Sequence, residues 1–93
     1  MYELKFSNYI KYVLQNPVAA QRLKDEVKKA YNKIKMNPFI YPAVPVEYLA
    51  SKGYRFVNIK NYMLFFKVKE KKINIERFLY GPRDWINILN NMN

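Results

Sequence analysis

Residues 54–80, YRFVNIKNYMLFFKVKEKKINIERFLY, decide the fold. Two short polar breaks, Lys60-Asn61 and Glu70-Lys71-Lys72, divide this stretch into three apolar segments. Because the segments are rich in β-branched and aromatic residues, they predict strands over residues 54–59, 62–69 and 73–80. Connections as short as these force neighbouring strands to run antiparallel. The stretch therefore predicts a three-stranded antiparallel meander.

The alternation of side chains predicts which residues share a face of each strand. The second strand presents four apolar residues on one face: Tyr62, Leu64, Phe66 and Val68. On the third strand, strict alternation predicts one face made by Ile73, Ile75 and Leu79. The opposite face of that strand is then made by Asn74, Glu76, Phe78 and Tyr80.

The sequence before the meander predicts a strand over residues 2–6 and two helices over residues 8–15 and 18–35. Ser7 is a suitable N-cap for the first helix, and Asn16-Pro17 suits the start of the second. Residues 37–52 hold three prolines and predict an ordered loop without a regular element, whose apolar side chains lie against the domain. A short helix is predicted over residues 84–89.

These elements predict one domain over residues 1–93, in the order β-α-α-β-β-β-short α. The fold class is α+β, with an N-terminal helical hairpin packed on a small, mainly antiparallel sheet. The chain lacks cysteine, so disulfides and thiolate metal sites are excluded, and it lacks histidine, the usual general base near neutral pH. We expect a cytoplasmic protein with no membrane span, no metal site and no cofactor.

A net charge of +10 is the strongest signal in the composition. A field of this size attracts polyanions and steers them to the surface. The charge therefore predicts a nucleic acid or an acidic protein as partner, and the alternative is a basic surface without a specific partner.

Four segments of the chain carry recognisable motifs: Asn16-Pro17-Val18-Ala19-Ala20, Gly53-Tyr54-Arg55-Phe56-Val57, Asn61-Tyr62-Met63-Leu64-Phe65-Phe66-Lys67-Val68 and Leu79-Tyr80-Gly81-Pro82-Arg83-Asp84-Trp85. In this order they resemble motifs of the RelE/ParE toxin superfamily, and the resemblance covers residues 16–89. The resemblance implies the toxin of a type II toxin–antitoxin system, with an acidic antitoxin as partner. It implies either a ribosome-dependent endonuclease that cuts mRNA or, as in ParE-type relatives, an inhibitor of DNA gyrase. The alternative is a non-enzymatic or decayed basic binding protein that is held by an acidic antitoxin.

Two departures from the family pattern bear on these implications. Only residues 7–15 are available for a first helix that is longer in relatives. Met63 occupies the position of an arginine that relatives with nuclease activity carry, and the histidine that some relatives use as a base has no counterpart. Enzymatic activity therefore stays an open question at the level of the sequence.

Three residues are candidates for the active site: Arg83, Arg55 and Tyr80. Arg83 matches the basic position before the last helix of the family and suits a phosphate, although it can instead pair with Asp84. Arg55 is either functional or an anchor that binds loop carbonyls or a carboxylate, and Tyr80 either stacks a base or packs in the domain. Glu76, on the predicted face of Tyr80, is the best candidate for a general base.

Five lysines are candidates for binding nucleic acid, and the sequence places them around one hairpin: Lys60, Lys67, Lys69, Lys71 and Lys72. They can follow a phosphate backbone. The alternative is that they keep a sheet edge solvated and prevent strand pairing with other chains.

Overall fold

The computed structural model describes residues 2–6, 21–81 and 84–91. The predicted first helix over residues 8–15, its Ser7 cap and the Asn16-Pro17 junction lie outside these residues. Arg83 also lies outside them.

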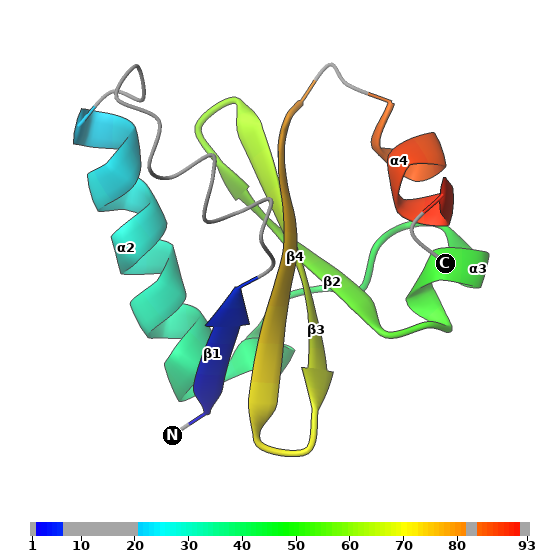
Figure 1. The fold of residues 1–93 in the computed structure, drawn as a ribbon, viewed down its shortest axis with the longest axis horizontal. Helices are drawn as coiled ribbons and strands as arrows, with labels where there is room; N and C mark the ends of the chain where they lie inside the picture. Colours follow the sequence, from blue (N-terminus) through cyan, green and yellow to red (C-terminus); the bar gives the residue numbers. More distant parts are fainter. Residues whose placement is uncertain (1, 7–20, 82–83, 92–93) are drawn as a thin grey trace.

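The four described strands form one mixed sheet in the order β1-β4-β3-β2 (Figure 1). The strands are β1 (Glu3–Phe6), β2 (Tyr54–Ile59), β3 (Tyr62–Lys69) and β4 (Lys72–Tyr80). β1 runs parallel to β4, whereas the β2–β3 and β3–β4 pairs are antiparallel. The predicted α+β class and the mainly antiparallel sheet are confirmed.

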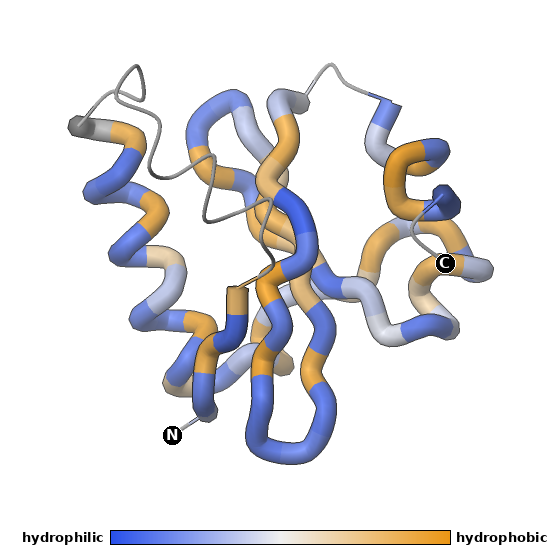
Figure 2. Tube along the Cα trace, in the orientation of Figure 1, coloured by the Kyte–Doolittle hydropathy of each residue, from blue (hydrophilic) through white to orange (hydrophobic). Residues whose placement is uncertain are grey.

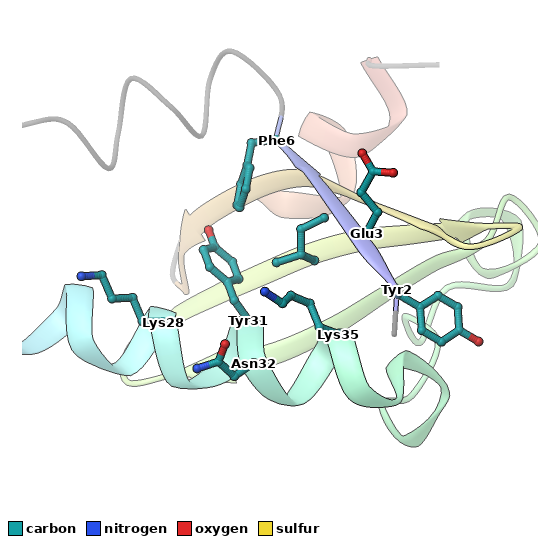
Figure 3. A pocket seen from close by; sticks show the side chains of 8 residues that line it. Tyr2, Glu3, Phe6, Lys28, Tyr31, Asn32 and Lys35 are labelled. Atoms are coloured by element: carbon teal, nitrogen blue, oxygen red, sulfur yellow. The ribbon is translucent and has the colours of Figure 1, made fainter.

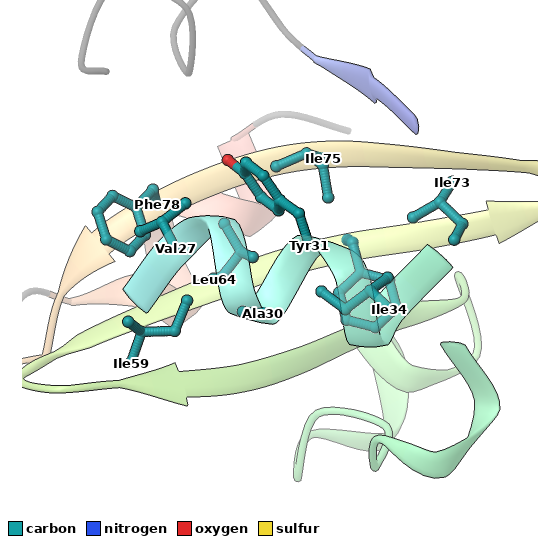
Figure 4. Packing of buried hydrophobic residues seen from close by; sticks show 10 residues of the cluster. Val27, Ala30, Tyr31, Ile34, Ile59, Leu64, Ile73, Ile75 and Phe78 are labelled. Atoms are coloured by element: carbon teal, nitrogen blue, oxygen red, sulfur yellow. The ribbon is translucent and has the colours of Figure 1, made fainter. Parts of the chain in front are cut away.

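One face of the sheet is covered by α2 (Gln21–Met36), whose apolar stripe is visible in Figure 2. Side chains from α2 and from three strands form the first core cluster, which is drawn in Figure 4. Its buried members are Val27, Ala30, Tyr31, Ile34, Ile59, Leu64, Phe66, Ile73, Ile75 and Phe78. The periodicity of the second predicted helix located this stripe, and Leu64 and Phe66 share the predicted face of β3.

The other face of the sheet is covered by two short helices, α3 (Glu47–Ala50) and α4 (Trp85–Asn91) (Figure 1). Here the Phe65 and Trp85 rings lie 5.4 Å apart, centroid to centroid. The buried members of this second core cluster are Val44, Leu49, Tyr54, Phe65, Leu79 and Leu89. The sheet is therefore the middle of three layers.

The segment between α2 and β2 contains regular elements, so the prediction of a loop without any was wrong. Besides α3 it holds the 3-10 turn η1 (Pro38–Ile40). The Asn37 side chain accepts a hydrogen bond from the Phe39 N–H at 3.2 Å, and Pro38 occupies a first-turn position where its missing N–H costs nothing. The packing prediction was only half right, since Leu49 is buried but Ile40 is exposed.

A β-bulge in β4 overturns the predicted faces of this strand. Phe65 pairs with Arg77 whereas Phe66 pairs with Ile75, so the register passes over one extra residue, Glu76. An extra residue shifts the alternation of everything that follows it. Phe78 consequently joins the first core cluster, and Leu79, predicted on the face of Ile75, belongs to the second.

Candidate functional site

A hollow of about 450 Å³ lies at the β2–β3 turn, where β4 ends. It is lined by Asn58, Lys60, Asn61, Tyr62, Met63, Tyr80 and Gly81. Lys60 has a positive φ of 57°, which lets the chain reverse within two residues. The hollow thus brings together two of the predicted site residues, Tyr80 and Lys60.

Tyr80 stands at the rim of this hollow on an aromatic support. The Tyr62 ring stacks on the buried Phe78 ring at 4.7 Å with an interplanar angle of 16°. The Tyr80 ring lies 5.6 Å from the Tyr62 ring and is 49% exposed. A half-exposed ring fixed from behind can stack against a flat group, and its hydroxyl can donate a hydrogen bond.

Gly81 closes the hollow by a tight backbone contact. Its N–H donates a hydrogen bond to the Asn61 carbonyl over 2.6 Å. A Cβ at this position would lie 3.0 Å from the same oxygen. The end of β4 is therefore fastened to the β2–β3 turn, which holds Tyr80 beside Lys60.

We expect Gly81→Ala to lower the free energy of unfolding by about 1.5 kcal/mol, because the new methyl group pushes the Asn61 carbonyl away. Chemical denaturation measures the change. The control is Asn61→Ala, which keeps the backbone oxygen and is expected to cost less than about 0.5 kcal/mol. Equal stability of Gly81→Ala and the wild-type protein would contradict the contact.

Arg55, at the start of β2, lies far from the hollow. Its Nη1 donates a hydrogen bond to the Tyr41 carbonyl, and its guanidinium lies 5.0 Å from the centroid of the Phe39 ring. Arg55 of β2 pairs with Phe66 of β3, whereas Tyr80 of β4 pairs with Tyr62 of β3. Phe66 and Tyr62 are four residues apart along β3, which is roughly 13 Å. Arg55 and Tyr80 also lie on strands that are two strand spacings apart. The structure therefore does not bring Arg55 and Tyr80 into one site.

Met63 lines the same hollow as Tyr80 and also packs against the second core cluster, so it brings no charge to this place. Glu76, in contrast, lies apart from Tyr80. Glu76 and Tyr80 were predicted on one face of β4 from strict alternation. The bulge at Glu76 breaks this alternation, so the prediction of a shared face was wrong. Glu76 instead lines a shallow hollow with Lys5 and Asn74.

The carboxylate of Asp84 caps the start of α4. It accepts hydrogen bonds from the Asn87 backbone N–H at 3.5 Å and from the Asn87 side-chain amide. These bonds satisfy a donor of the first helical turn, as expected of an aspartate N-cap. They fix the point at which the chain enters α4 after residues 82–83.

The five lysines do not surround a single hairpin as predicted. Lys60 lies in the β2–β3 turn, and the other four lie at or near the β3–β4 turn at the opposite end of β3 (Figure 1). Eight residues of β3 separate the two turns, which is roughly 25 Å. Two of the four cover aromatic rings: Lys67 Nζ lies 4.3 Å from the Tyr54 ring centroid and Lys71 Nζ lies 5.4 Å from that of Tyr2.

A second hollow, of about 690 Å³, lies between β1 and α2 (Figure 3). It is lined by Tyr2, Glu3, Leu4, Phe6, Lys28, Tyr31, Asn32 and Lys35. Tyr31 packs edge-on against Phe6 at 5.1 Å. Its hydroxyl is buried and has no hydrogen-bond partner among the described residues. Burial raises the pKa of this hydroxyl above its usual value, because the phenolate cannot be solvated there.

We expect Tyr31→Phe to stabilise the protein by about 1 kcal/mol, because it removes a buried polar group without removing the ring. The raised pKa adds a dependence on pH. Above about pH 10 the unfolded chain ionises Tyr31 while the folded chain keeps it protonated, so the wild-type protein loses stability as pH rises. Denaturation midpoints measured between pH 8 and 11 should show a smaller decline in Tyr31→Phe, and parallel declines would contradict this account.

No helix in the described part of the chain is both long and apolar enough to cross a membrane. Within the same ranges, no three acidic side chains gather as they would around a metal ion.

The sequence matches one family, described as the ParE toxin of type II toxin–antitoxin systems, over residues 5–85. The protein belongs to the ParE toxin family. The match spans most of the chain, from β1 to the start of α4, and the described elements have the layout expected of a RelE/ParE-like fold. Membership implies that this ParE-family toxin has a cognate antitoxin. Among curated proteins, none matches the sequence.

Sequence reasoning missed one surface feature of this toxin. Phe39 and Ile40 were expected to lie against the domain, but both are more than half exposed, and so is Met36 at the end of α2. Asn37-Pro38 is the sequence signal for the start of this turn, but it does not indicate which side chains of the turn face the solvent.

Proposed function

We propose that this toxin arrests growth by binding and inhibiting DNA gyrase and not by cutting RNA. The observation that supports this function best is the separation of Arg55 from Tyr80. Arg55 is engaged by the Tyr41 carbonyl on one side of the sheet, and Tyr80 lies four strand positions away. This separation supports inhibition by binding, because a joint action on one phosphodiester needs Arg55 and Tyr80 side by side.

Cleavage of RNA by its 2′-hydroxyl requires a base beside the attacking oxygen and cations beside the phosphate. In the hollow at the β2–β3 turn, Lys60 is the cation. Among the described residues, no carboxylate lines this hollow to act as the base. Met63, which packs on the second core cluster, leaves the usual arginine position of nuclease relatives without a charge.

The test is a supercoiling assay with purified gyrase, relaxed plasmid and increasing toxin. We expect supercoiling to fall as toxin is added and to recover when the toxin is first mixed with its antitoxin. A normal supercoiling rate at a large excess of folded toxin would overturn the proposal. The proposed target also places the toxin in the cytoplasm.

The second candidate function is ribosome-dependent cleavage of mRNA, favoured by the exposed Tyr80 ring beside Lys60. Under this function the ring stacks on a base and Arg83 binds the phosphate. Tyr80→Ala would then lower cleavage in translating extracts about tenfold or more, since stacking contributes about 1–3 kcal/mol. Tyr80→Phe keeps the ring and is the matched control. This candidate would be excluded if the wild-type toxin arrests growth but leaves mRNA intact in translating extracts.

A further inference from the structure

The strongest exposed apolar patch of the described chain lies where α2 passes into η1. Met36 is 76% exposed, Phe39 is 54% exposed and Ile40 is 63% exposed. Together with the neighbouring Tyr2 these residues are called the η1 patch below. Side chains of this size gathered within five consecutive residues are uncommon on a surface without a partner, because each leaves apolar area in water.

The η1 patch is held in place before any partner arrives. Buried Pro38 anchors η1, and Asn37 caps it through the Phe39 N–H. The Tyr2 backbone N–H donates to the Lys35 carbonyl at 3.1 Å, which ties β1 to the end of α2. The Tyr2 ring then meets Phe39 edge-on at 6.1 Å. A surface fixed in this way loses little conformational entropy on binding.

The cations around the η1 patch indicate what it binds. Lys71 lies over the Tyr2 ring and Arg55 over the Phe39 ring. Glu3, the acidic residue next to Tyr2, is paired with Lys5 through an Nζ–Oε1 distance of 3.7 Å. The rim is therefore positive around an apolar centre, which complements a segment that carries apolar residues flanked by carboxylates.

Two other occupants fit less well. Bases stack on free ring faces, but one face of Tyr2 and one of Phe39 are already covered by Lys71 and Arg55. The aliphatic side chains of Met36 and Ile40 also offer nothing to a phosphate backbone. A second copy of the chain would bring the same cations together, and a net charge of +10 on each copy opposes that contact.

We propose that the η1 patch is the docking surface for an acidic, amphipathic segment of the cognate antitoxin, with Phe39 and Ile40 as the central contacts. This inference rests on the toxin–antitoxin function and is independent of the target that the toxin inhibits. The apolar side chains of the antitoxin segment cover Phe39 and Ile40, and its carboxylates face Arg55 and Lys71.

The probe is the acidic protein encoded next to the toxin gene, purified and titrated against immobilised toxin. We expect the double variant Phe39→Ser/Ile40→Ser to weaken binding about 30-fold or more, since central apolar contacts dominate such interfaces. The matched control is Tyr48→Ser, which changes a 58% exposed aromatic ring on α3. Its affinity should stay within about threefold of the wild-type value.

Charge reversal tests the rim separately. Lys71→Glu is expected to slow association about fivefold at low salt, with a smaller effect at high salt, because steering is screened. The control is Lys60→Glu at the far turn, which should leave the association rate nearly unchanged. Circular dichroism melts confirm folding, and Ile40→Lys alone replaces the double variant if that variant does not fold.

The outcomes of the binding experiment separate a failure of the η1-patch proposal from a failure of the toxin–antitoxin function on which it rests. If the wild-type toxin binds the neighbouring gene product and the double variant binds it equally well, the patch proposal is overturned and the function stands. If the wild-type toxin does not bind that protein, the function itself fails. Two further results for the double variant would also overturn the proposal when its antitoxin binding is normal. One is that it no longer retains a labelled single-stranded RNA that the wild-type toxin binds, and the other is that it loses a dimer that the wild-type toxin shows in light scattering.

Discussion

Replacing Phe66 by alanine is expected to lower the free energy of unfolding by about 4 kcal/mol. Phe66 is fully buried in the centre of the first core cluster, in the middle of β3. Phe66 pairs with Ile75 of β4 and with Arg55 of β2. The Tyr41 ring packs edge-on against the Phe66 ring, with the two centroids 6.1 Å apart. Truncation leaves a cavity between the sheet and α2 that the surrounding strands cannot fill.

A loss of this size is a large part of the stability of so small a domain, for which about 5–14 kcal/mol is typical. Urea denaturation of the purified toxin measures it, and we expect the unfolding midpoint of the variant to fall to a clearly lower urea concentration than that of the wild-type toxin. Phe39→Ala is the matched control, expected to cost less than about 1 kcal/mol because Phe39 is exposed. A cost below about 2 kcal/mol for Phe66→Ala would show that the first core cluster is less well packed than described.

Arg55→Ala is expected to cost about 2.5 kcal/mol, through the loss of a charged hydrogen bond and of packing. The Arg55 side chain holds the segment before α3 against β2 by its bond to the Tyr41 carbonyl. Two backbone hydrogen bonds join the same segment to β2: the Val44 N–H donates to the Tyr54 carbonyl and the Phe56 N–H to the Pro42 carbonyl. Without the guanidinium, these bonds at the sheet edge become more exposed to water.

Arg55→Lys separates this anchoring role from a catalytic one. A lysine can donate one bond to the Tyr41 carbonyl, so about half of the lost stability should return. If Arg55 only anchors, folded Arg55→Lys and Arg55→Ala arrest growth at 25 °C as the wild-type toxin does. Full stability combined with a loss of growth arrest would instead assign Arg55 to the active site, and thermal melts run on the same samples decide between the two.

The sequence was sufficient to predict the meander because its strands are adjacent in the chain and carry strong β-forming residues. α2 followed from the three- and four-residue spacing of apolar residues such as Val27 and Ile34. The bulge could not be predicted in this way. Glu76 is left out of the pairing because Phe78 and Leu79 pack into the core clusters on opposite faces of the sheet. This packing exists only in the assembled sheet.

The candidate site was predicted less well, for a similar reason. Tyr80 and Lys60 come together because Gly81 binds the Asn61 carbonyl, a contact between residues twenty positions apart. The spacing of Arg55 from Tyr80 depends on strand register, which motifs do not contain. The outward direction of Phe39 depends on a 3-10 turn, whereas apolar composition by itself predicts burial.

The parallel pairing of β1 with β4 has a consequence for the toxin during its own synthesis. Glu3 of β1 pairs with Lys72 of β4, roughly 70 residues later in the chain. At translation rates of about 5–20 residues per second, β1 waits roughly 4–14 seconds before its neighbour exists. The nascent chain therefore cannot close its sheet until β4 has left the ribosome. Each new toxin molecule therefore lacks its complete sheet during that interval.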